Sequence, residues 1–182
     1  MPARPRHDAL RFCPHCGAET LRQTSPKRLA CAACGKALFI NAAAAVGGLV
    51  VDERGRLLVI VRAEEPARGT WDLPGGFADP GETAEETLRR EVREETGLDL
   101  ASAEYFASEP NLYPYAGVTY PTLDLVFLCR PAAGGADARP GDAAEIADCL
   151  WVPRGDLDPA RFGLESTRRI AERYLGDSAQ HG

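Results

Sequence analysis

Three glutamates are spaced so that a helix would place them on one side. Glu91, Glu94 and Glu95 share an arc of about 100° at 3.6 residues per turn, and the apolar stripe that contains Leu88 and Val92 borders it. Like charges at this spacing repel one another by roughly a few tenths of a kcal/mol per pair in water, and by more beside a core. Carboxylate ligation of a hard divalent cation, Mg²⁺ or Mn²⁺, reverses the sign of that interaction. The alternative is a solvated acidic face balanced by neighbouring arginines.

Four of the six cysteines form two C-x-x-C pairs, and each pair is followed by glycine. They are Cys13, Cys16, Cys31 and Cys34. This spacing suits tetrahedral zinc. Because thiolates fill all four positions, no place is left for water, and we predict a structural Zn²⁺ site. The alternative of disulfides is weaker, since nothing marks the chain as exported and Cys129 and Cys149 stand alone.

The elements that would position these groups follow from local patterns. Two β-rich runs, at 43–51 and 56–61, flank a turn and predict a hairpin. A loop dense in glycine and proline follows at 69–77. The acidic helix is predicted to begin after Thr83, with a capping box to Glu86, and to end at Gly97.

Beyond the helix the pattern is mainly of strands. We predict strands at 105–108, 119–129 and 147–152, a loop at 109–117, a surface connection at 131–142 and a helix at 166–175. Strands around two well-separated helices predict an α/β sandwich.

Composition and charge bound the function. The chain has 182 residues, 45% of them hydrophobic and 26% charged, which excludes a disordered, collagenous or coiled-coil protein. No apolar stretch reaches the roughly 18–20 residues of a membrane span. The first residues also lack the apolar core of a secretory signal, so we expect a cytoplasmic protein. Residues 1–40 carry a net charge of +5 and the remainder −11. This asymmetry predicts a metal-stabilised module at 1–40 and a main domain at 41–182.

The sequence from residue 76 to 98 is GFADPGETAEETLRREVREETGL. It resembles the Nudix box, G-x5-E-x7-R-E-U-x-E-E-x-G-U, in which U is a bulky apolar residue. The seven fixed places, which a random window would match with a probability on the order of 10⁻⁸, are filled by Gly76, Glu82, Arg90, Glu91, Glu94, Glu95 and Gly97. The cysteine pairs are similar to those of a zinc-ribbon subgroup of this family. The resemblance implies a Nudix α/β/α sandwich with a mixed sheet behind a small zinc ribbon. It also implies Mg²⁺- or Mn²⁺-dependent hydrolysis of a nucleoside diphosphate derivative.

The resemblance also implies roles for single residues. Glu94 and Glu95 would hold the divalent ions, and Glu91 would be a shared ligand or the general base. Arg90 would fix the Glu91 carboxylate, and Gly76 would present its carbonyl to the metal.

Two further glutamates complete the predicted site. Glu82 is placed at the substrate site, where it would grip the loop or the helix start, with metal ligation as the alternative. Glu145 precedes the strand predicted at 147–152 and is expected to supply another carboxylate to the metal. Simple surface exposure is the alternative for Glu145.

Candidate substrate contacts follow the box. We predict that three tyrosines stack on a nucleobase or flavin: Tyr113, Tyr115 and Tyr120. The alternative is that these side chains only pack within the protein or lie at a hinge. Residues 108–114, SEPNLYP, are similar to the SQPWPFP signature of NADH pyrophosphatases. They keep the serine, the flanking prolines and an aromatic residue, and they depart from the signature at Glu109, Asn111 and Leu112. NADH, ADP-ribose and FAD therefore all remain as substrates. Two other functions stay open: removal of an RNA cap with the basic ribbon holding the RNA, and non-catalytic nucleotide binding. A homodimer is also possible.

Overall fold

Local signals define the first helix of the computed structural model, which describes residues 10–115, 118–132 and 137–177. Helix α1 spans Ala84–Thr96. The Thr83 side chain accepts from the Glu86 amide, and the Glu86 side chain accepts from the Thr83 amide. Gly97 ends the helix with a left-handed φ of 72°. The predicted capping box and helix end are therefore confirmed.

The chain divides into two compact units. One contains residues 1–43 and 112–122, and the other residues 44–111 and 123–182. Residues 1–9, part of the predicted N-terminal module, and 133–136, part of the predicted connection, lie outside the described residues.

Two three-stranded sheets lie wholly or mainly in the larger unit. The first has the order β4 (Ala43–Val50), β8 (Val118–Pro131), β7 (Leu100–Tyr115), and the second β6 (Trp71–Asp72), β5 (Arg56–Arg62), β9 (Ile146–Pro153). Two short 3-10 turns, η1 (Arg154–Asp156) and η2 (Pro159–Arg161), lead to helix α2 (Glu165–Gly176). Strand pairs β5–β6 and β5–β9 are antiparallel, and a parallel bridge joins Trp71 to Phe162.

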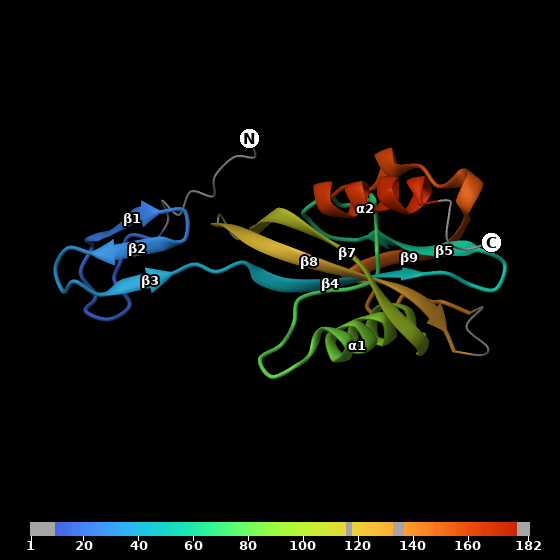
Figure 1. Ribbon diagram of the computed structural model, residues 1–182, viewed down its shortest axis with the longest axis horizontal. Coiled ribbons are helices and arrows are strands. Elements are labelled where there is room, and N and C mark those ends of the chain that lie inside the picture. The colour runs from blue at the N-terminus through green and yellow to red at the C-terminus, as the bar shows by residue number, and fades with distance from the viewer. Residues whose placement is uncertain (1–9, 116–117, 133–136, 178–182) are drawn as a thin grey trace. The chain divides into compact units, whose positions relative to one another are not determined.

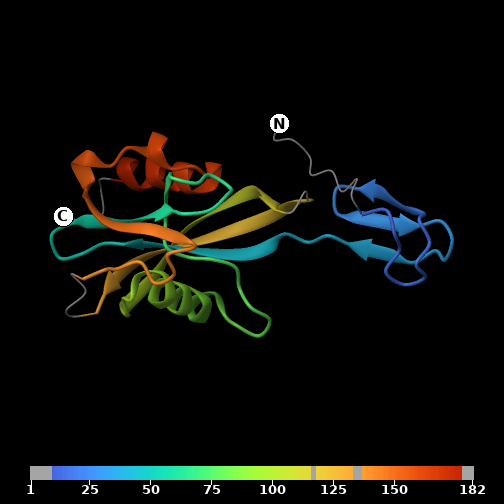
Figure 2. The same ribbon diagram turned by 180° about the vertical axis from the view of Figure 1, so that it is seen from behind.

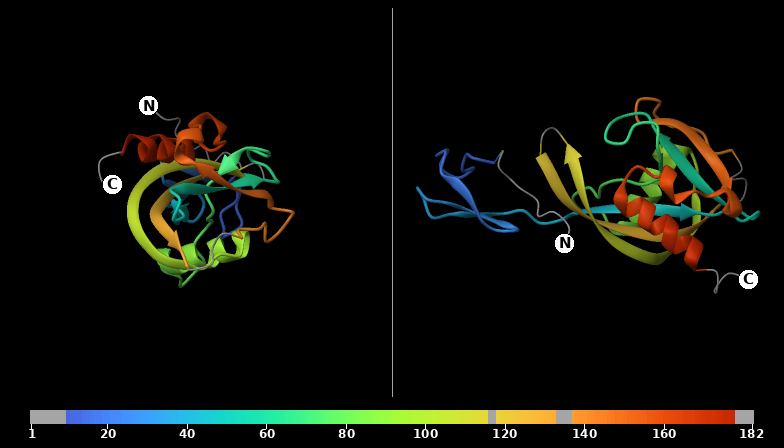
Figure 3. Two further views of the ribbon diagram at one scale, coloured as in Figure 1. Left: turned by 90° about the vertical axis from the view of Figure 1, so that its right-hand side faces the viewer. Right: turned by 90° about the horizontal axis from the view of Figure 1, so that it is seen from above.

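The helices lie on opposite sides of the strands of the larger unit, α2 on one side and α1 on the other (Figures 1, 2 and 3). Alternating side chains of a strand point to opposite faces, so β5 serves two cores. Leu57 and Val59 pack with Ile170 of α2. Leu58 packs with Leu88 of α1. The predicted α/β sandwich is confirmed.

The predicted hairpin at 43–51 and 56–61 is only partly correct. The turn is present and is held by Asp52, whose carboxylate accepts from the amides of Arg54 and Arg56. The two strands, however, enter different sheets and meet only at the bridge between Val51 and Leu57. The longest run of buried residues lies at the end of β4 and in the middle of β5. Each strand pairs along its length with a strand distant in the sequence, β4 with β8 and β5 with β9, instead of with its neighbour.

The predicted loop at 109–117 is wrong over residues 109–115, and residues 116–117 lie outside the described residues. Strand β7 continues through this segment to Tyr115 and takes in the shorter strand predicted at 105–108. Pro110 and Pro114 suggested a loop, but β7 is an outer strand of its sheet, where a missing N–H is tolerated. The strands predicted at 119–129 and 147–152 and the helix at 166–175 are confirmed within β8, β9 and α2.

The smaller unit contains a third sheet, made of β1 (Leu21–Ser25), β2 (Arg28–Cys31) and β3 (Ala37–Phe39). All its pairings are antiparallel. Its core consists of Leu21, Leu29 and two of the cysteines, with Leu38 packed against them. Among the described residues, no helix is long and apolar enough to cross a membrane.

Candidate active site and metal centre

Helix α1 brings the three predicted acids to one side, at different depths. The Glu91 side chain is 17% exposed and that of Glu94 59%. Glu95 is half-buried. Burial of Leu88 and Val92 beneath the sheet fixes the rotation of the helix, and that rotation places the acids at the border of the core.

A glycine loop after β6 faces these acids. The Gly75 amide donates to Glu95 Oε2 at 2.8 Å. The Gly76 carbonyl accepts from the Val46 amide at 2.8 Å, so one of its lone pairs is already used within the protein. A Cβ on Gly76 would lie 2.5 Å from the carboxyl carbon of Glu91. Gly76 therefore has to lack a side chain for Glu91 to occupy its place.

Gly75 offers a test of this loop. Its φ is 152°, and a Cβ there would lie 2.1 Å from the Val46 carbonyl oxygen. We expect Gly75→Ala to lower the free energy of unfolding by more than about 3 kcal/mol, because both the conformation and the contact are unfavourable. Gly55→Ala is the matched control, since its φ is 74° but nothing lies within 4 Å, and it should cost about 1–2 kcal/mol. Urea unfolding measures the free energy of unfolding of both variants. Equal losses would contradict the close approach of Gly75 to the Val46 carbonyl.

Arg90 joins the acids to the loop. Its guanidinium donates to Glu82 through Nε at 2.8 Å and through a second nitrogen at 2.9 Å. It also donates to Glu91 at 2.8 Å, to Glu94 at 3.1 Å and to the Phe77 carbonyl at 3.2 Å. These contacts raise the pKa of Arg90, chiefly through Glu82. Arg90 thus orients Glu91 and Glu94 and neutralises part of their charge.

Glu82 uses its carboxylate within the protein. Besides Arg90, it accepts from the Asp79 amide at 3.1 Å and from the Thr87 hydroxyl at 3.0 Å. The geometry favours bracing of the loop and helix start, and contact of Glu82 with substrate stays a prediction. The hydrogen bond from Arg90 is the main cause that lowers its pKa to about 2.

The pH dependence of stability tests the Glu82 contacts. Because the folded-state pKa is lower than the ordinary value of 4.5, the stabilisation is complete above pH 4.5 and is lost as the pH falls toward 2. We expect Glu82→Gln to lower Tm at pH 7 and to match the unsubstituted protein near pH 2. Thermal melts across this range measure the effect. Glu85→Gln, on the exposed side of α1, should not follow this pattern.

A fourth acid, Glu145, lies exposed in the loop before β9, and its metal ligation stays a prediction. The Arg139 and Gly141 amides donate to the carbonyls of Thr96 and Glu95 at 3.0 Å each, so the loop satisfies the last turn of α1. The Ala63 amide holds the Glu145 carbonyl at 2.8 Å. The charge of Glu145 raises the pKa of both Glu91 and Glu95.

Sequence reasoning missed Asp72. It is buried and pairs with Arg62 at 2.9 Å, and it also accepts from the Leu73 amide at 2.9 Å. Burial raises its pKa despite the Arg62 charge, and its own charge acts on Glu95. The signal that was available is a single acid inside an otherwise apolar run, Trp71 to Leu73.

The electrostatics of the acid group suit a cation. Burial, followed by the charges of Asp72, Glu91 and Glu145, raises the pKa of Glu95 to about 8, although the Gly75 amide opposes this shift. Burial also raises the pKa of Glu91. Converging, partly desolvated carboxylates are unfavourable alone and become ligands when a divalent ion is added. Here Glu91 and Glu94 point to Arg90, so an ion has to compete with that arginine for them.

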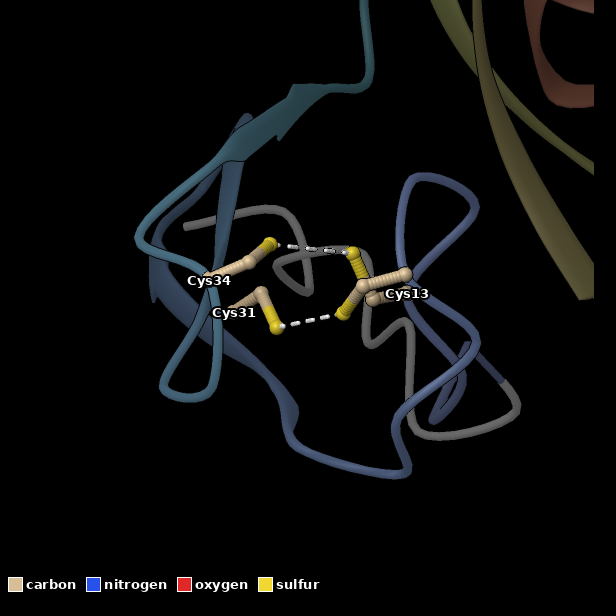
Figure 4. A group of neighbouring side chains, drawn as sticks. Cys13, Cys31 and Cys34 are labelled. Carbon is tan, nitrogen blue, oxygen red and sulfur yellow. Dashed lines mark hydrogen bonds between the residues drawn. The ribbon is translucent and has the colours of Figure 1, made fainter.

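The cysteines form the second candidate centre, in the smaller unit. Sγ atoms of Cys13 and Cys34 lie 3.8 Å apart, and those of Cys16 and Cys31 3.7 Å (Figure 4). All four lie within 4.8 Å of one another. A tetrahedron with Zn–S bonds of about 2.3 Å has edges of about 3.8 Å. Two of the sulfur–sulfur distances already have this length, and the others do not exceed 4.8 Å, so the cluster suits this metal.

Backbone turns shape this cluster. Gly17 and Gly35 have φ of 73° and 71°, and their amides donate to the carbonyls of Cys13 and Cys31. The Thr20 hydroxyl contacts the Cys31 sulfur at 3.1 Å, and this hydrogen bond is the main cause that lowers the pKa of Cys31 to about 6. Deprotonated thiolates are the form that binds metal.

The three predicted tyrosines and the acids of α1 belong to different compact units of the chain. Tyr115 and Tyr120 are 64% and 41% exposed, and Tyr113 is half-buried. All three belong to the unit that contains the cysteines, whereas the acids belong to the other. Their contact with a base or flavin stays a prediction.

Taken together, the fold and the site define an α/β-sandwich protein with a carboxylate-bearing helix behind a glycine loop. The sequence profile of the NUDIX domain matches residues 42–174. The chain therefore belongs to the Nudix family, and the family resemblance and its fold are confirmed.

Curated relatives and a solved structure agree with this family and its fold. The chain is 30% identical over 167 residues to the NAD-capped RNA hydrolase NudC of Stutzerimonas stutzeri and 32% identical over 165 residues to that of Chromobacterium violaceum. Each match covers 91% of this chain but only 56% and 57% of those proteins. A NUDIX hydrolase from Nitrosomonas europaea superposes with a TM-score of 0.73 at 24% identity, over 93% of this chain and 92% of that one.

Proposed function

We propose that the protein hydrolyses the pyrophosphate bond of a nucleoside diphosphate derivative of the NAD class, which includes NADH, ADP-ribose and FAD. The observation that carries the proposal is the placement of two α1 acids against the glycine loop: Glu95 accepts from the Gly75 amide, and Glu91 fills the space beside Gly76. The charge of Glu145 acts on both, and the pKa of Glu95 is raised to about 8. Relatives named for hydrolysis of NAD-capped RNA support the NAD-type pyrophosphate.

In this proposal Glu91, Glu94, Glu95 and Glu145 would hold Mg²⁺ or Mn²⁺, with the Gly76 carbonyl as a further ligand. When bound, such an ion spreads the negative charge of the phosphoryl oxygens and orients water. The chain contributes orientation: Arg90 fixes two of the carboxylates, and the Gly75 amide fixes Glu95.

The reaction balances without further reactants. A water oxygen forms a bond to one phosphorus, and the bond from that phosphorus to the bridging oxygen breaks. One carboxylate of the site accepts the water proton. The products are a nucleoside monophosphate and a second phosphorylated compound.

The same chemistry on NAD-capped RNA is a second candidate substrate. The relatives' names favour it, and so does the positive charge of residues 1–40.

We also propose that the four cysteines hold Zn²⁺ and that the domains divide between residues 40 and 41. We further propose that the protein is cytoplasmic, where the thiols stay reduced.

A substrate panel tests the proposed function. It contains ADP-ribose, NADH, NAD, FAD, a diadenosine polyphosphate and NAD-capped RNA, each with Mg²⁺ and with Mn²⁺. We expect nucleoside monophosphate from at least one NAD-class compound, and none after EDTA treatment. If no compound releases monophosphate with either ion, the proposed function is wrong.

A further inference from the structure

The three-stranded ribbon sheet has two unlike faces. Leu21 lies opposite Cys31, and Leu29 opposite Leu38. Directly opposed residues share a face of the sheet, and residues two apart along a strand share it as well. This face is the one that packs on the cysteine cluster, and Leu21, Leu29 and Cys31 on it are buried.

The other face is open, and we call it the ribbon face. It consists of two cross-strand rows, Arg22–Ala30–Ala37 and Arg28–Phe39, read from the same register. Phe39 is 54% exposed. Arg22 and Ala37 are also exposed, and Arg28 and Ala30 are half-buried. The sheet is visible at the β1–β3 labels in Figure 1.

Among the described residues of its own unit, no carboxylate pairs with the charges on the ribbon face. Arg28 donates to the Thr24 hydroxyl at 3.0 Å and Arg22 to the Leu21 carbonyl at 2.8 Å, contacts that hold the guanidinium groups without neutralising them. Glu19 is the one acidic residue in the sequence from 10 to 43, and it pairs with Arg11. Lys27 and Lys36 add positive charge at the turns.

We infer that the ribbon face binds the single-stranded RNA that follows a cap, an inference that rests on NAD-capped RNA as substrate. Arginines on a sheet contact phosphates, and an exposed aromatic ring stacks on an unpaired base. The alanines of the face are small enough to leave space for a base beside Phe39. Charge complementarity selects a polyanion, and the exposed ring selects one with unpaired bases.

The test measures binding, separately from chemistry. The probe is a 5′-labelled, uncapped, single-stranded RNA of about 12 nucleotides, followed by fluorescence anisotropy at several salt concentrations. Three variants are compared with the full-length protein: Arg28→Gln, Phe39→Ala, and the control Arg54→Gln, which removes an exposed arginine from the larger unit. Retained zinc shows that the ribbon is folded in each.

We expect distinct signatures for the two ribbon substitutions. Phe39→Ala should weaken binding by about 5- to 140-fold, the range for loss of one stacked base, with little change in salt dependence. Arg28→Gln should weaken binding and reduce the slope of log K against log salt by about 0.7, the value for one contact with a single strand. Arg54→Gln should change neither quantity.

Several results would overturn the inference. Unchanged affinity in Phe39→Ala and Arg28→Gln with zinc retained is one. Equal affinity for duplex RNA is another. If sedimentation shows that either ribbon substitution dissolves a dimer, a second copy of the chain covers the face instead. The substrate panel is run on the unsubstituted protein in parallel: no release of monophosphate from any compound, with RNA binding intact, rejects the proposed chemistry alone, and release of monophosphate without RNA binding rejects this inference alone.

Discussion

Glu95→Gln is expected to lower the turnover of the preferred NAD-class substrate by about 10²–10³-fold, the effect of losing several kcal/mol of charge stabilisation in the transition state. Glu94→Gln should behave similarly, although its more exposed side chain makes fewer contacts within the protein. Single-turnover measurements with saturating Mn²⁺ separate this loss from weaker substrate binding.

Glu95→Gln should leave the stability of the fold unchanged or raise it, although it lowers turnover. The pKa of Glu95 in the folded protein, about 8, is above the ordinary value of 4.5, so the charged side chain destabilises the fold increasingly as the pH rises from 4.5 through 8. A glutamine oxygen can still accept from Gly75. We therefore expect a Tm at pH 8 in EDTA that is equal to or higher than that of the unsubstituted protein.

Glu85→Gln, on the same helix and exposed, is the matched control for both measurements. It should change neither turnover nor Tm appreciably. Retention of full turnover in both Glu94→Gln and Glu95→Gln would falsify the assignment of the site.

Cys31→Ser is expected to abolish stoichiometric zinc binding and to unfold residues 10–40. Cys31 is buried, its sulfur lies 3.7 Å from Cys16 and 3.1 Å from Thr20, and the core of this unit is small. Structural zinc contributes apparent free energies of about 10–16 kcal/mol in isolated zinc-binding peptides, more than so few apolar side chains can supply. Metal analysis and limited proteolysis of the ribbon measure the two losses.

Cys129→Ser provides the contrast. Cys129 is a buried thiol in the core beside α1, far in sequence from the cluster, and its replacement should leave the zinc content at one per chain. A metal-free preparation of the unsubstituted protein with a protease-resistant ribbon would contradict a structural role for zinc.

The parts of the fold that were correctly predicted are those with local signals. Thr83, Glu86 and Gly97 define the ends of α1 by contacts within a few residues. The partner of a strand carries no such local signal. The pairing of β5 with β9 joins residues about 90 positions apart, and the sequence next to each strand pointed to a nearer partner.

The site shows the same division. The spacing of Glu91, Glu94 and Glu95 is a property of one helix and was predictable. The placement of Glu145 near them depends on a loop whose amides bind the end of α1, and only the family resemblance suggested it. Asp72 was missed because its local signal, an acid between Trp71 and Leu73, does not reveal that its charge acts on Glu95.

The two prolines of β7 have a consequence for self-association. An unpaired strand edge can template growth of an intermolecular sheet, and natural proteins interrupt such edges. Pro110 and Pro114 both lie in this outer strand, and neither has an N–H to donate. A proline that faces the free edge would deny a second chain one hydrogen bond at that point. The residues that made β7 look like a loop in the sequence are thus of the kind that interrupts edge-to-edge pairing of strands.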